Sequence, residues 1–332
     1  MNIKTILITG AAGFIGFYLC KRLVEQGFSV VGIDNINDCY DINLKYDRLK
    51  VLGIISSEAR QWNTASQSVN KHIDFTFIRA HIEDIKSLDH FFDTYTFDVV
   101  CHLAAQTNVR SSEQHNDRYI ETNIKGFLNV LECCRKYNTT RLVYASSSSV
   151  YGNSNELPFE EKVQTDYPIS FYAATKKSNE LMAHVYSHLY GIETIGLRFF
   201  TVYGPWGRPD MALFRFTDAI LKGKPIDVYN HGDHVRDFTY IDDIIDGIES
   251  TLLHTSKNKA LYKLYNVGTN SPVELLDFIN YLEITTGIKS KRNMQPNQAG
   301  DVHQTWANVK NLNIDYGYKP KTSLKNGVNA FV

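Results

Sequence analysis

The sequence has few of the features that mark specialised classes of protein. It contains five cysteines, an odd number, and none of them forms a Cys-x-x-Cys pair or stands with histidine at the spacing of zinc ligands. A disulfide framework and a metal site are therefore not expected. No apolar run approaches the roughly 18 residues of a membrane helix, and the run within residues 1–10 is too short for a signal peptide. We therefore expect a cytoplasmic protein without a membrane partner.

An excess of charge of either sign is also missing. The chain has 35 basic and 36 acidic side chains and a formal net charge of -1, so nothing draws it as a whole to nucleic acid or to an anionic membrane. No nucleic-acid partner is expected, and any other partner must be recognised by a local site. With 332 residues, of which 43% are hydrophobic, the chain is long enough for about two domains or one large domain with a substantial core.

Two patterns of hydrophobic residues, one typical of strands and one typical of helices, alternate through the first part of the chain. Short runs rich in valine, isoleucine, leucine and aromatic residues predict strands at 5–8, 29–33, 75–78, 98–103, 141–145 and 194–198. Stretches with helical spacing predict helices at 16–26, 85–94, 119–137 and 173–190. This alternation is typical of an α/β fold with a doubly wound, parallel, Rossmann-type sheet.

Two segments depart from this alternation. Residues 40–71 are polar and too numerous for an ordinary connection, so they contain either a helix of their own or a flexible insertion. Beyond residue 200 glycine and proline crowd into one loop and the later elements become shorter. We therefore predict a Rossmann-type domain at 1–200 and a smaller C-terminal substrate-binding lobe at 201–332, with part of 225–275 returning to the larger domain.

A glycine-rich turn follows the first predicted strand and leads directly into a helical pattern. Its residues 10–16 read Gly-Ala-Ala-Gly-Phe-Ile-Gly. Glycines permit a tight turn and a close approach of the backbone to a diphosphate, and the helix N-terminus adds unpaired N–H groups and the positive end of its dipole. Such a turn can also be a plain connection between a strand and a helix.

The second predicted strand strengthens the case for a dinucleotide. It ends at Asp34, 18 residues after Gly16, which is close to the spacing of an acid that binds the adenosine ribose. Asp34 favours NAD over NADP, because a carboxylate repels a 2′-phosphate and no arginine follows it at once.

A candidate catalytic pair stands at the start of the last predicted helix. Tyr172 and Lys176 lie one turn apart on one helix face, and a lysine cation beside a phenol lowers the pKa of the phenol and makes it a usable base. Tyr46 and Lys50 have the same spacing. Position favours Tyr172, because the strand before it ends in serines 146–149, at the carboxyl edge where parallel sheets bind ligands. A hydroxyl there can share the substrate's proton with Tyr172, although serine runs also occur in polar turns.

The sequence contains five motifs between residues 8 and 211: ITGAAGFIG at 8–16, HLAAQ at 102–106, SSSSVYG at 146–152, YAATK at 172–176 and RFFTVYGPWGRPDM at 198–211. With Asp34 they resemble the extended short-chain dehydrogenase/reductase family, and within it the nucleotide-sugar epimerases, most closely the UDP-glucuronate 4-epimerases. The resemblance implies an NAD-dependent isomerase that interconverts UDP-glucuronate and UDP-galacturonate through a 4-keto sugar while bound NAD is transiently reduced.

The resemblance also assigns site residues. NAD would be held by Gly10, Gly13, Phe14, Ile15, Gly16, Asp34, Asn35, Leu103, Ala104 and Ala105, together with Tyr172 and Lys176. The catalytic residues would be Ser147, Tyr172 and Lys176. The sugar carboxylate would be held by Ser148, Ser149, Thr201 and Arg208, and the diphosphate and uridine ribose by Arg236 and Asp301.

The choice of subfamily rests on a few of these positions. In sugar-nucleotide 4,6-dehydratases an Asp-Glu pair stands where this chain has Ser148 and Ser149, and decarboxylases of UDP-glucuronate usually carry glutamate at the second position. Thr201 replaces an asparagine that is common in epimerases of neutral sugars. The alternatives are a 4-epimerase of UDP-glucose or UDP-N-acetylglucosamine, a dTDP-glucose 4,6-dehydratase, or an NAD-binding protein that has kept the fold without turnover.

Two positions depart from the family pattern. His81 stands where the family usually has an aspartate near the adenine, and the loop 294–301 is longer than the usual turn before Asp301. Arg236 could instead form a salt bridge with a nearby aspartate. Because family members commonly pair two helices per subunit, we expect a homodimer formed by the predicted helices 119–137 and 173–190.

Overall fold

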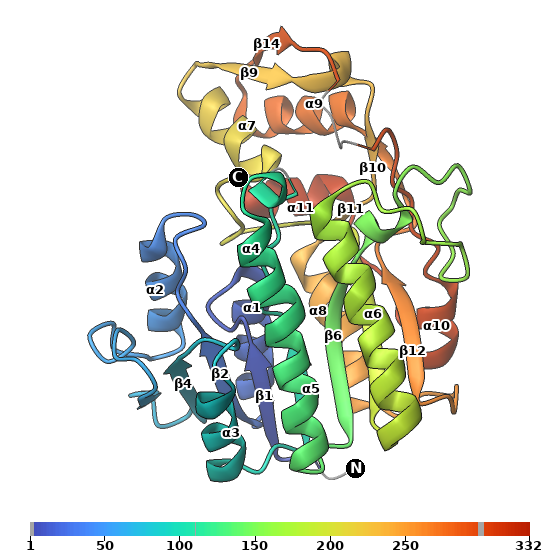
Figure 1. Cartoon of the computed structure of the whole chain (residues 1–332). Helices are drawn as coiled ribbons and strands as arrows, with labels where there is room; N and C mark the ends of the chain where they lie inside the picture. The colour runs from blue at the N-terminus through green and yellow to red at the C-terminus, as the bar shows by residue number, and fades with distance from the viewer. Residues whose placement is uncertain (1–2, 110, 298–301) are drawn as a thin grey trace.

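The computed structural model describes residues 3–109, 111–297 and 302–332. Within these residues the chain forms an eight-stranded sheet whose strands run in the order β12-β7-β6-β5-β1-β2-β4-β3 (Figure 1). The strands are β1 (Thr5–Thr9), β2 (Ser29–Asp34), β3 (Ala65–Gln67), β4 (Phe75–Arg79), β5 (Val99–His102), β6 (Arg141–Ser147), β7 (Glu193–Phe199) and β12 (Tyr262–Val267). All neighbours pair in parallel except β3, which runs antiparallel to β4.

Helices cover both faces of this sheet. Along β1, Ile6 and Ile8 belong to one apolar cluster, whereas Leu7 between them belongs to another, because successive side chains of a strand point to opposite faces. The first face carries α1 (Phe14–Glu25), α2 (Ile42–Val51) and α8 (Ile241–Leu253), and the second carries α3 (Ile85–Thr94), α5 (Phe127–Lys136) and α6 (Phe171–Tyr190). The predicted doubly wound parallel sheet is confirmed, and its strands read as continuous apolar runs because both faces are buried.

The predicted strands and helices of the first part of the chain are all present. The helix predicted at 119–137 is divided, with α4 (Asn116–Tyr119) and a π-helical segment Ile120–Gly126 before α5. Segment 40–71 contains a helix, α2, whose N-cap Asp41 accepts a hydrogen bond from the backbone N–H of Asn43. The short strand β3 in the same segment has no apolar pattern and was not predicted.

Beyond β7 the chain builds a smaller lobe above the carboxyl ends of the strands (Figure 1). Its elements are β8 (Thr201–Tyr203), α7 (Ala212–Leu221), β9 (Pro225–Val228), β10 (Val235–Arg236), β11 (Phe238–Tyr240), β13 (Val273–Glu274), α9 (Leu275–Thr286), β14 (Lys291–Met294) and α11 (Leu324–Phe331). Between β11 and β13 the chain returns to the large sheet as α8 and β12, and α10 (Lys310–Tyr316) packs there against β12. The larger apolar cluster continues from the sheet into this lobe.

This arrangement places a cavity at the carboxyl edge of the sheet. β1 lies between β5 and β2, and the connections from β1 and from β5 leave on opposite faces, which is where open α/β sheets bind ligands. The cavity has a volume of about 910 Å³ and is lined by both lobes. Among the described residues no helix is both long and apolar enough to span a bilayer.

Candidate active site

The glycine-rich turn between β1 and α1 forms one wall of the cavity. Gly10 has a φ of +74°, and a Cβ atom there would lie 2.8 Å from the backbone nitrogen of Ala104. A Cβ at Gly16 would lie 2.1 Å from the carbonyl oxygen of Gly10. Gly13 is the N-cap of helix α1 and has no side chain to bond the first N–H groups of the helix, so these groups and the positive end of the helix dipole face the cavity. The turn therefore fits the diphosphate of a dinucleotide.

Asp34 lies beside this turn at the end of β2, and its carboxylate is fixed by several donors. One oxygen accepts a hydrogen bond from the backbone N–H of Ala12 at 3.2 Å, and the other accepts one from the N–H of Ile36 at 2.8 Å. The Lys45 ammonium of α2 stands 3.5 Å from the same carboxylate. A fixed, buried carboxylate at the cavity wall suits the hydroxyls of an adenosine ribose.

The other cofactor residues that the sequence suggests lie around the same wall. Phe14, Ile15, Asn35, Leu103, Ala104 and Ala105 all line the cavity. Ala80 and Ile82, on either side of His81, also line the cavity. The His81 ring stacks on Trp62 with ring centroids 4.6 Å apart.

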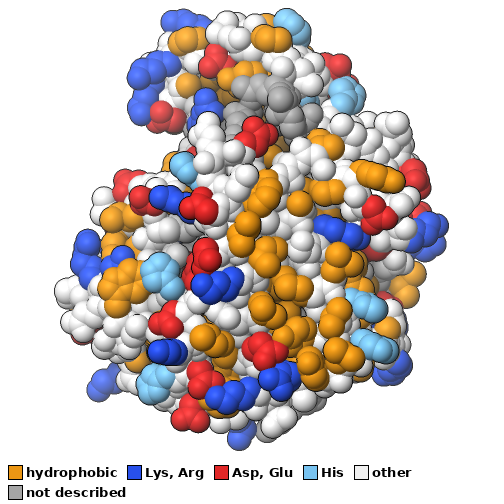
Figure 2. All heavy atoms as spheres, in the orientation of Figure 1, with side chains coloured by type: hydrophobic (Ala, Val, Ile, Leu, Met, Phe, Trp, Pro, Cys, Tyr) orange, Lys and Arg blue, Asp and Glu red, His pale blue; other side chains and the backbone are white. Residues whose placement is uncertain are grey.

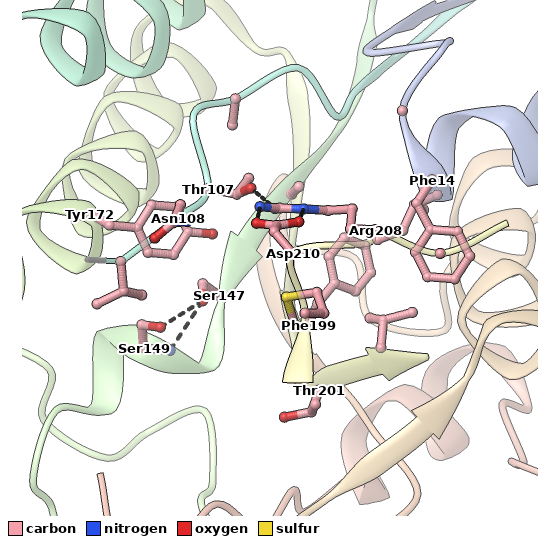
Figure 3. A pocket seen from close by; sticks show the side chains of 18 of the residues that line it. Phe14, Thr107, Asn108, Ser147, Ser149, Tyr172, Phe199, Thr201, Arg208 and Asp210 are labelled. Atoms are coloured by element: carbon pink, nitrogen blue, oxygen red, sulfur yellow. Dashed lines mark hydrogen bonds and ion pairs between the residues drawn. The ribbon is translucent and has the colours of Figure 1, made fainter. Parts of the chain in front are cut away.

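Tyr172 and Ser147 meet across the cavity from the glycine-rich turn (Figure 3). Tyr172 stands in the first turn of α6, where the Ser170 side chain caps the helix by accepting from the N–H of Ala173. Ser147 ends β6, and its oxygen accepts from the backbone N–H of Ser149 at 3.1 Å. Burial raises the pKa of Tyr172, and the hydrogen bond of Ser147 and the charge of Arg208 oppose that rise.

Lys176 lies under the tyrosine rather than beside its hydroxyl. Its ammonium donates to the carbonyl oxygen of Ala145 at 2.8 Å and lies 6.0 Å from the centroid of the Tyr172 ring. Burial lowers the pKa of Lys176 to about 8, while the negative charge of Glu180 acts in the opposite direction. In this geometry the groups that lower the pKa of Tyr172 are Ser147 and Arg208.

A buried ion pair supports this part of the site. Glu180, one turn beyond Lys176, accepts two hydrogen bonds from Arg198 at 2.8 and 2.9 Å and a third from Ser146 at 2.6 Å. On the neighbouring strand, His102 contacts the Thr9 hydroxyl at 2.9 Å, and burial together with the charge of Lys176 lowers its pKa to about 3. His102 is therefore neutral, and Lys176 and Arg198 are the cations below the site.

The residues suggested for a sugar carboxylate come together on the next stretch of wall. Ser148 and Ser149 open the turn after β6, Thr201 begins β8, and Arg208 follows in the loop after β8; all four line the cavity. In Figure 3 Arg208 points into the space in front of Tyr172. The fold therefore brings these side chains to one place although they stand up to 60 positions apart.

Arg208 already has a carboxylate partner in the chain. Its guanidinium donates to both oxygens of Asp210, at 3.0 and 2.6 Å, and also to the hydroxyl of Thr107. Burial would lower the pKa of Arg208, but the hydrogen bond and charge of Asp210 outweigh it and raise that pKa. Sequence reasoning missed Asp210 and Thr107, although Asp210 is visible two positions after the arginine in Arg-Pro-Asp.

Arg236 reaches the cavity from the small lobe. It stands on β10 and donates to the carbonyl oxygens of Val302 at 2.7 Å and His303 at 2.8 Å. The neighbouring Asp237 is fully buried and accepts from the backbone N–H groups of Thr269, Asn270 and Ala307. Asp301, suggested for the uridine ribose, lies outside the described residues.

The sequence of the whole α/β part matches a known family. Residues 6–268 match the NAD dependent epimerase/dehydratase family. The chain belongs to this family. Protein CapI of Staphylococcus aureus is 48% identical over 98% of this chain and 97% of its own length, and UDP-glucuronate 4-epimerase 2 of Arabidopsis thaliana is 42% identical over 100% of this chain and 75% of its own.

Among solved structures of the family, the fold is similar to that of UDP-glucuronic acid 4-epimerase from Bacillus cereus in complex with UDP-glucuronic acid and NAD. The TM-score is 0.88 at 34% identity, and the likeness covers 98% of this chain and 97% of that one. As an epimerase/dehydratase family member, this protein is NAD-dependent, and the glycine-rich turn with Asp34 is the place in its structure that fits the cofactor.

Proposed function

We propose that this protein is a UDP-glucuronate 4-epimerase, which interconverts UDP-glucuronate and UDP-galacturonate. The observation that carries the proposal is the wall facing Tyr172, where Arg208 and the hydroxyls of Ser148, Ser149 and Thr201 surround a space suited to a carboxylate. The relatives that act on UDP-glucuronate support it. Serines at 148 and 149 provide no carboxyl group for the elimination of water by a dehydratase.

The catalytic step follows from the placement of three side chains. Bound NAD supplies a reversible hydride acceptor at carbon 4 of the sugar. Tyr172 removes the proton of the 4-hydroxyl as that carbon loses hydride, and Ser147 shares the proton through its hydroxyl. Ser147 and Arg208 lower the pKa of the phenol, and Lys176 holds positive charge below its ring. The resulting 4-keto sugar turns about its link to the diphosphate and recovers the proton and hydride on its other face, which inverts carbon 4.

The wall formed by Ser148, Ser149, Thr201 and Arg208, here called the carboxylate wall, protects the keto intermediate from loss of carbon dioxide. A ketone at carbon 4 lies beta to the uronate carboxylate, and carbon dioxide is lost when the bond to the carboxylate aligns with the π system of the ketone. Hydrogen bonds from Ser148, Ser149, Thr201 and Arg208 hold the carboxylate near the plane of the ketone, where this alignment fails. The wall therefore serves both recognition and retention of the carboxylate.

The smaller lobe completes the substrate site in this proposal. Residues 1–200 together with α8 and β12 hold NAD, and the remainder of 201–332 holds the uridine diphosphate, with Arg236 toward the diphosphate. Asp301 stays assigned to the uridine ribose by resemblance alone. A cytoplasmic location stays a prediction from the sequence.

A homodimer is the proposed assembly. Six apolar side chains of the π-helical segment, α5 and α6 are between 39% and 61% exposed: Ile120, Leu128, Leu181, Val185, Leu189 and Tyr190. In Figure 2 apolar atoms gather over the face where Figure 1 draws α5 and α6. A contiguous apolar patch of this kind is typical of an interface. Light scattering of the Leu181→Glu variant tests it, since a charge at the centre of the patch should leave monomers.

The direct test of the activity is incubation with UDP-glucuronate, with and without added NAD, followed by chromatography with mass detection. We expect a product of unchanged mass that co-elutes with UDP-galacturonate, and at least about a hundredfold less of it from the Tyr172→Phe variant in the same time. A product lighter by carbon dioxide would mean that the carboxylate wall is misassigned. Turnover of UDP-glucose or UDP-N-acetylglucosamine without turnover of UDP-glucuronate would replace the proposal by a neutral-sugar epimerase.

A further inference from the structure

The helix α2 contributes an arginine that takes no part in the catalytic step. Arg48 is fully buried and is among the largest buried side chains of the described chain. One nitrogen of its guanidinium donates to the carbonyl oxygen of Ala12 at 2.9 Å and to the Tyr40 hydroxyl at 2.7 Å. The other donates to the carbonyl oxygens of Trp206 at 2.6 Å and Gly207 at 3.4 Å.

These carbonyls belong to two loops that both contribute residues to the wall of the cavity. Ala12 lies in the glycine-rich turn that fits the diphosphate of NAD, and its own N–H holds the carboxylate of Asp34. Trp206 and Gly207 lie directly before Arg208, in the loop that places the guanidinium of the carboxylate wall. A single side chain from a third segment therefore bonds to the cofactor wall and to the substrate wall.

The substrate loop needs such an anchor. Gly204 has a φ of +149° and Trp206 a φ of +57°, which is a conformation that bulky residues rarely adopt. A residue in this region persists only when its surroundings hold it there. Besides Arg48, the Tyr18 hydroxyl of α1 donates to the carbonyl oxygen of Pro205 at 3.1 Å. Both anchors come from the cofactor side of the cavity.

An arginine is well suited to this position. Within the described residues Arg48 has carbonyl and hydroxyl partners and forms no ion pair with a carboxylate. A guanidinium presents donors on two terminal nitrogens in a fixed plane, so each nitrogen can bond to a different loop. A lysine ammonium carries its donors on a single atom, and an apolar side chain has none. A buried cation that only filled space would cost free energy without fixing any loop.

We propose that Arg48 is a positioning residue that fixes the loop bearing Arg208 against the glycine-rich turn, and so couples retention of NAD to capture of the sugar carboxylate. Order in one wall then favours order in the other, and by linkage each ligand tightens the binding of the other. The part of this inference that concerns the carboxylate rests on the proposed function. The part that concerns the two loops does not.

The test compares Arg48→Met and Arg48→Lys with Arg141→Met as a matched control. Arg141 is also a buried arginine that donates to carbonyl oxygens, those of Leu252 and His254, and unlike Arg48 it also pairs with a carboxylate, that of Glu193. It begins β6 and so lies at the amino ends of the parallel strands, away from the cavity at their carboxyl ends. Two readouts need no turnover: hydrogen–deuterium exchange of the backbone at 204–210, and the amount of NAD released by heat from the purified, dialysed protein. The third is the separation of KM from kcat with UDP-glucuronate.

We expect Arg48→Met to accelerate exchange at 204–210 and weaken NAD binding, each by about tenfold, which corresponds to the loss of one hydrogen bond to a charged group. KM should rise by about the same factor, with a smaller change in kcat. Arg48→Lys can reach one loop but not both, and should show most of the same effects. Arg141→Met should lower the thermal midpoint while leaving exchange at 204–210, NAD content and KM near those of the unchanged protein.

Two results would overturn the proposal. One is an Arg48→Lys protein with wild-type exchange, NAD content and KM, which also decides the matter if Arg48→Met does not fold. The other is an Arg141→Met protein that loosens 204–210 as much as the Arg48 variants, since the effect would then be general destabilisation. If the unchanged protein fails to convert UDP-glucuronate while the Arg48 variants still loosen the loop and lose NAD, the proposed activity fails and the coupling of the two loops stands.

Discussion

The pair formed by Arg208 and Asp210 leads to a quantitative prediction about substrate choice. In this structure the guanidinium is held by both oxygens of Asp210, and the two side chains are 19% and 25% exposed. A sugar carboxylate that reaches Arg208 must share or replace this partner. A neutral sugar leaves the pair as it is. Replacement of Arg208 by methionine should therefore affect a uronate and leave a neutral sugar almost untouched.

The expected size of the effect follows from the strength of a hydrogen bond between the guanidinium and the sugar carboxylate. A hydrogen bond to a charged group contributes about 1.5–3 kcal/mol, and part of this is offset because Asp210 gives up its own bond in the complex. A net loss of about 1–2 kcal/mol corresponds to a fall of roughly 5- to 30-fold in kcat/KM for UDP-glucuronate. Arg208→Met also leaves Asp210 facing the sugar carboxylate, so the double variant Arg208→Met/Asp210→Asn should recover about three- to tenfold of the loss.

The assay measures kcat/KM with UDP-glucuronate and, in parallel, the inhibition constant of UDP-glucose as a competitor. The competitor serves as the neutral-sugar reference whether or not it is turned over, and we expect its inhibition constant to change by less than about threefold in both variants. A product lighter by carbon dioxide should also become detectable in Arg208→Met. Equal losses for the two sugar nucleotides, or a double variant worse than the single one, would refute the assignment of Arg208 to the sugar carboxylate.

Three further changes test other parts of the site. Tyr172→Phe should lower kcat by about 10²- to 10⁴-fold, as for the loss of a general base, with the NAD content of the purified protein unchanged; a loss of NAD would show that its main role is to bind the cofactor. Because the pKa of Lys176 is lowered to about 8, its charge disappears as pH rises through that value, and the alkaline limb of the kcat profile should lie there. Glu180→Gln removes the charge that raises this pKa, so the limb should move to lower pH, and a limb that stays in place would exclude Lys176 as its origin. Gly16→Ala should abolish NAD retention, since a Cβ there would lie 2.1 Å from the carbonyl oxygen of Gly10, and a protein that keeps its NAD would contradict the assigned turn.

Six of the eight strands of the sheet, β1, β2 and β4 to β7, were predictable from the sequence because their signals are local. Each parallel strand is a short apolar run, each helix on it shows its own period, and the glycine-rich turn and Asp34 carry the chemistry of the first βαβ unit within about 30 residues. The carboxyl ends of parallel strands share one edge, so the sequence alone was enough to place Ser147 and Tyr172 near the glycine-rich turn.

The rest depends on contacts between distant segments, which periodicity does not encode. The strand β12 joins the sheet beside β7 only after the chain has passed through part of the small lobe, and its own apolar pattern does not identify that neighbour. The burial of Arg48 could not be predicted for the same reason, since a lone arginine in a polar segment predicts a solvated helix face. Its burial becomes apparent only when Ala12 and Trp206 are brought to it.

The electrostatics of the cavity connects these long-range contacts to substrate choice. Arg208 is paired with Asp210, and Lys176 lies close to the charge of Glu180. The positive charge of each side chain is therefore already partly balanced by a carboxylate before a substrate binds. In the proposed complex a sugar carboxylate therefore exchanges partners with groups of the chain, and its net gain in binding free energy from Arg208 is smaller than an unpaired arginine would give. Because Arg208 is shared with Asp210, its guanidinium alone does not fix the orientation of the sugar carboxylate. The hydroxyls of Ser148, Ser149 and Thr201 then determine that orientation. Discrimination between a uronate and a neutral sugar thus depends on how firmly the Arg208 loop is held, which is the property that the hydrogen bonds of Arg48 control.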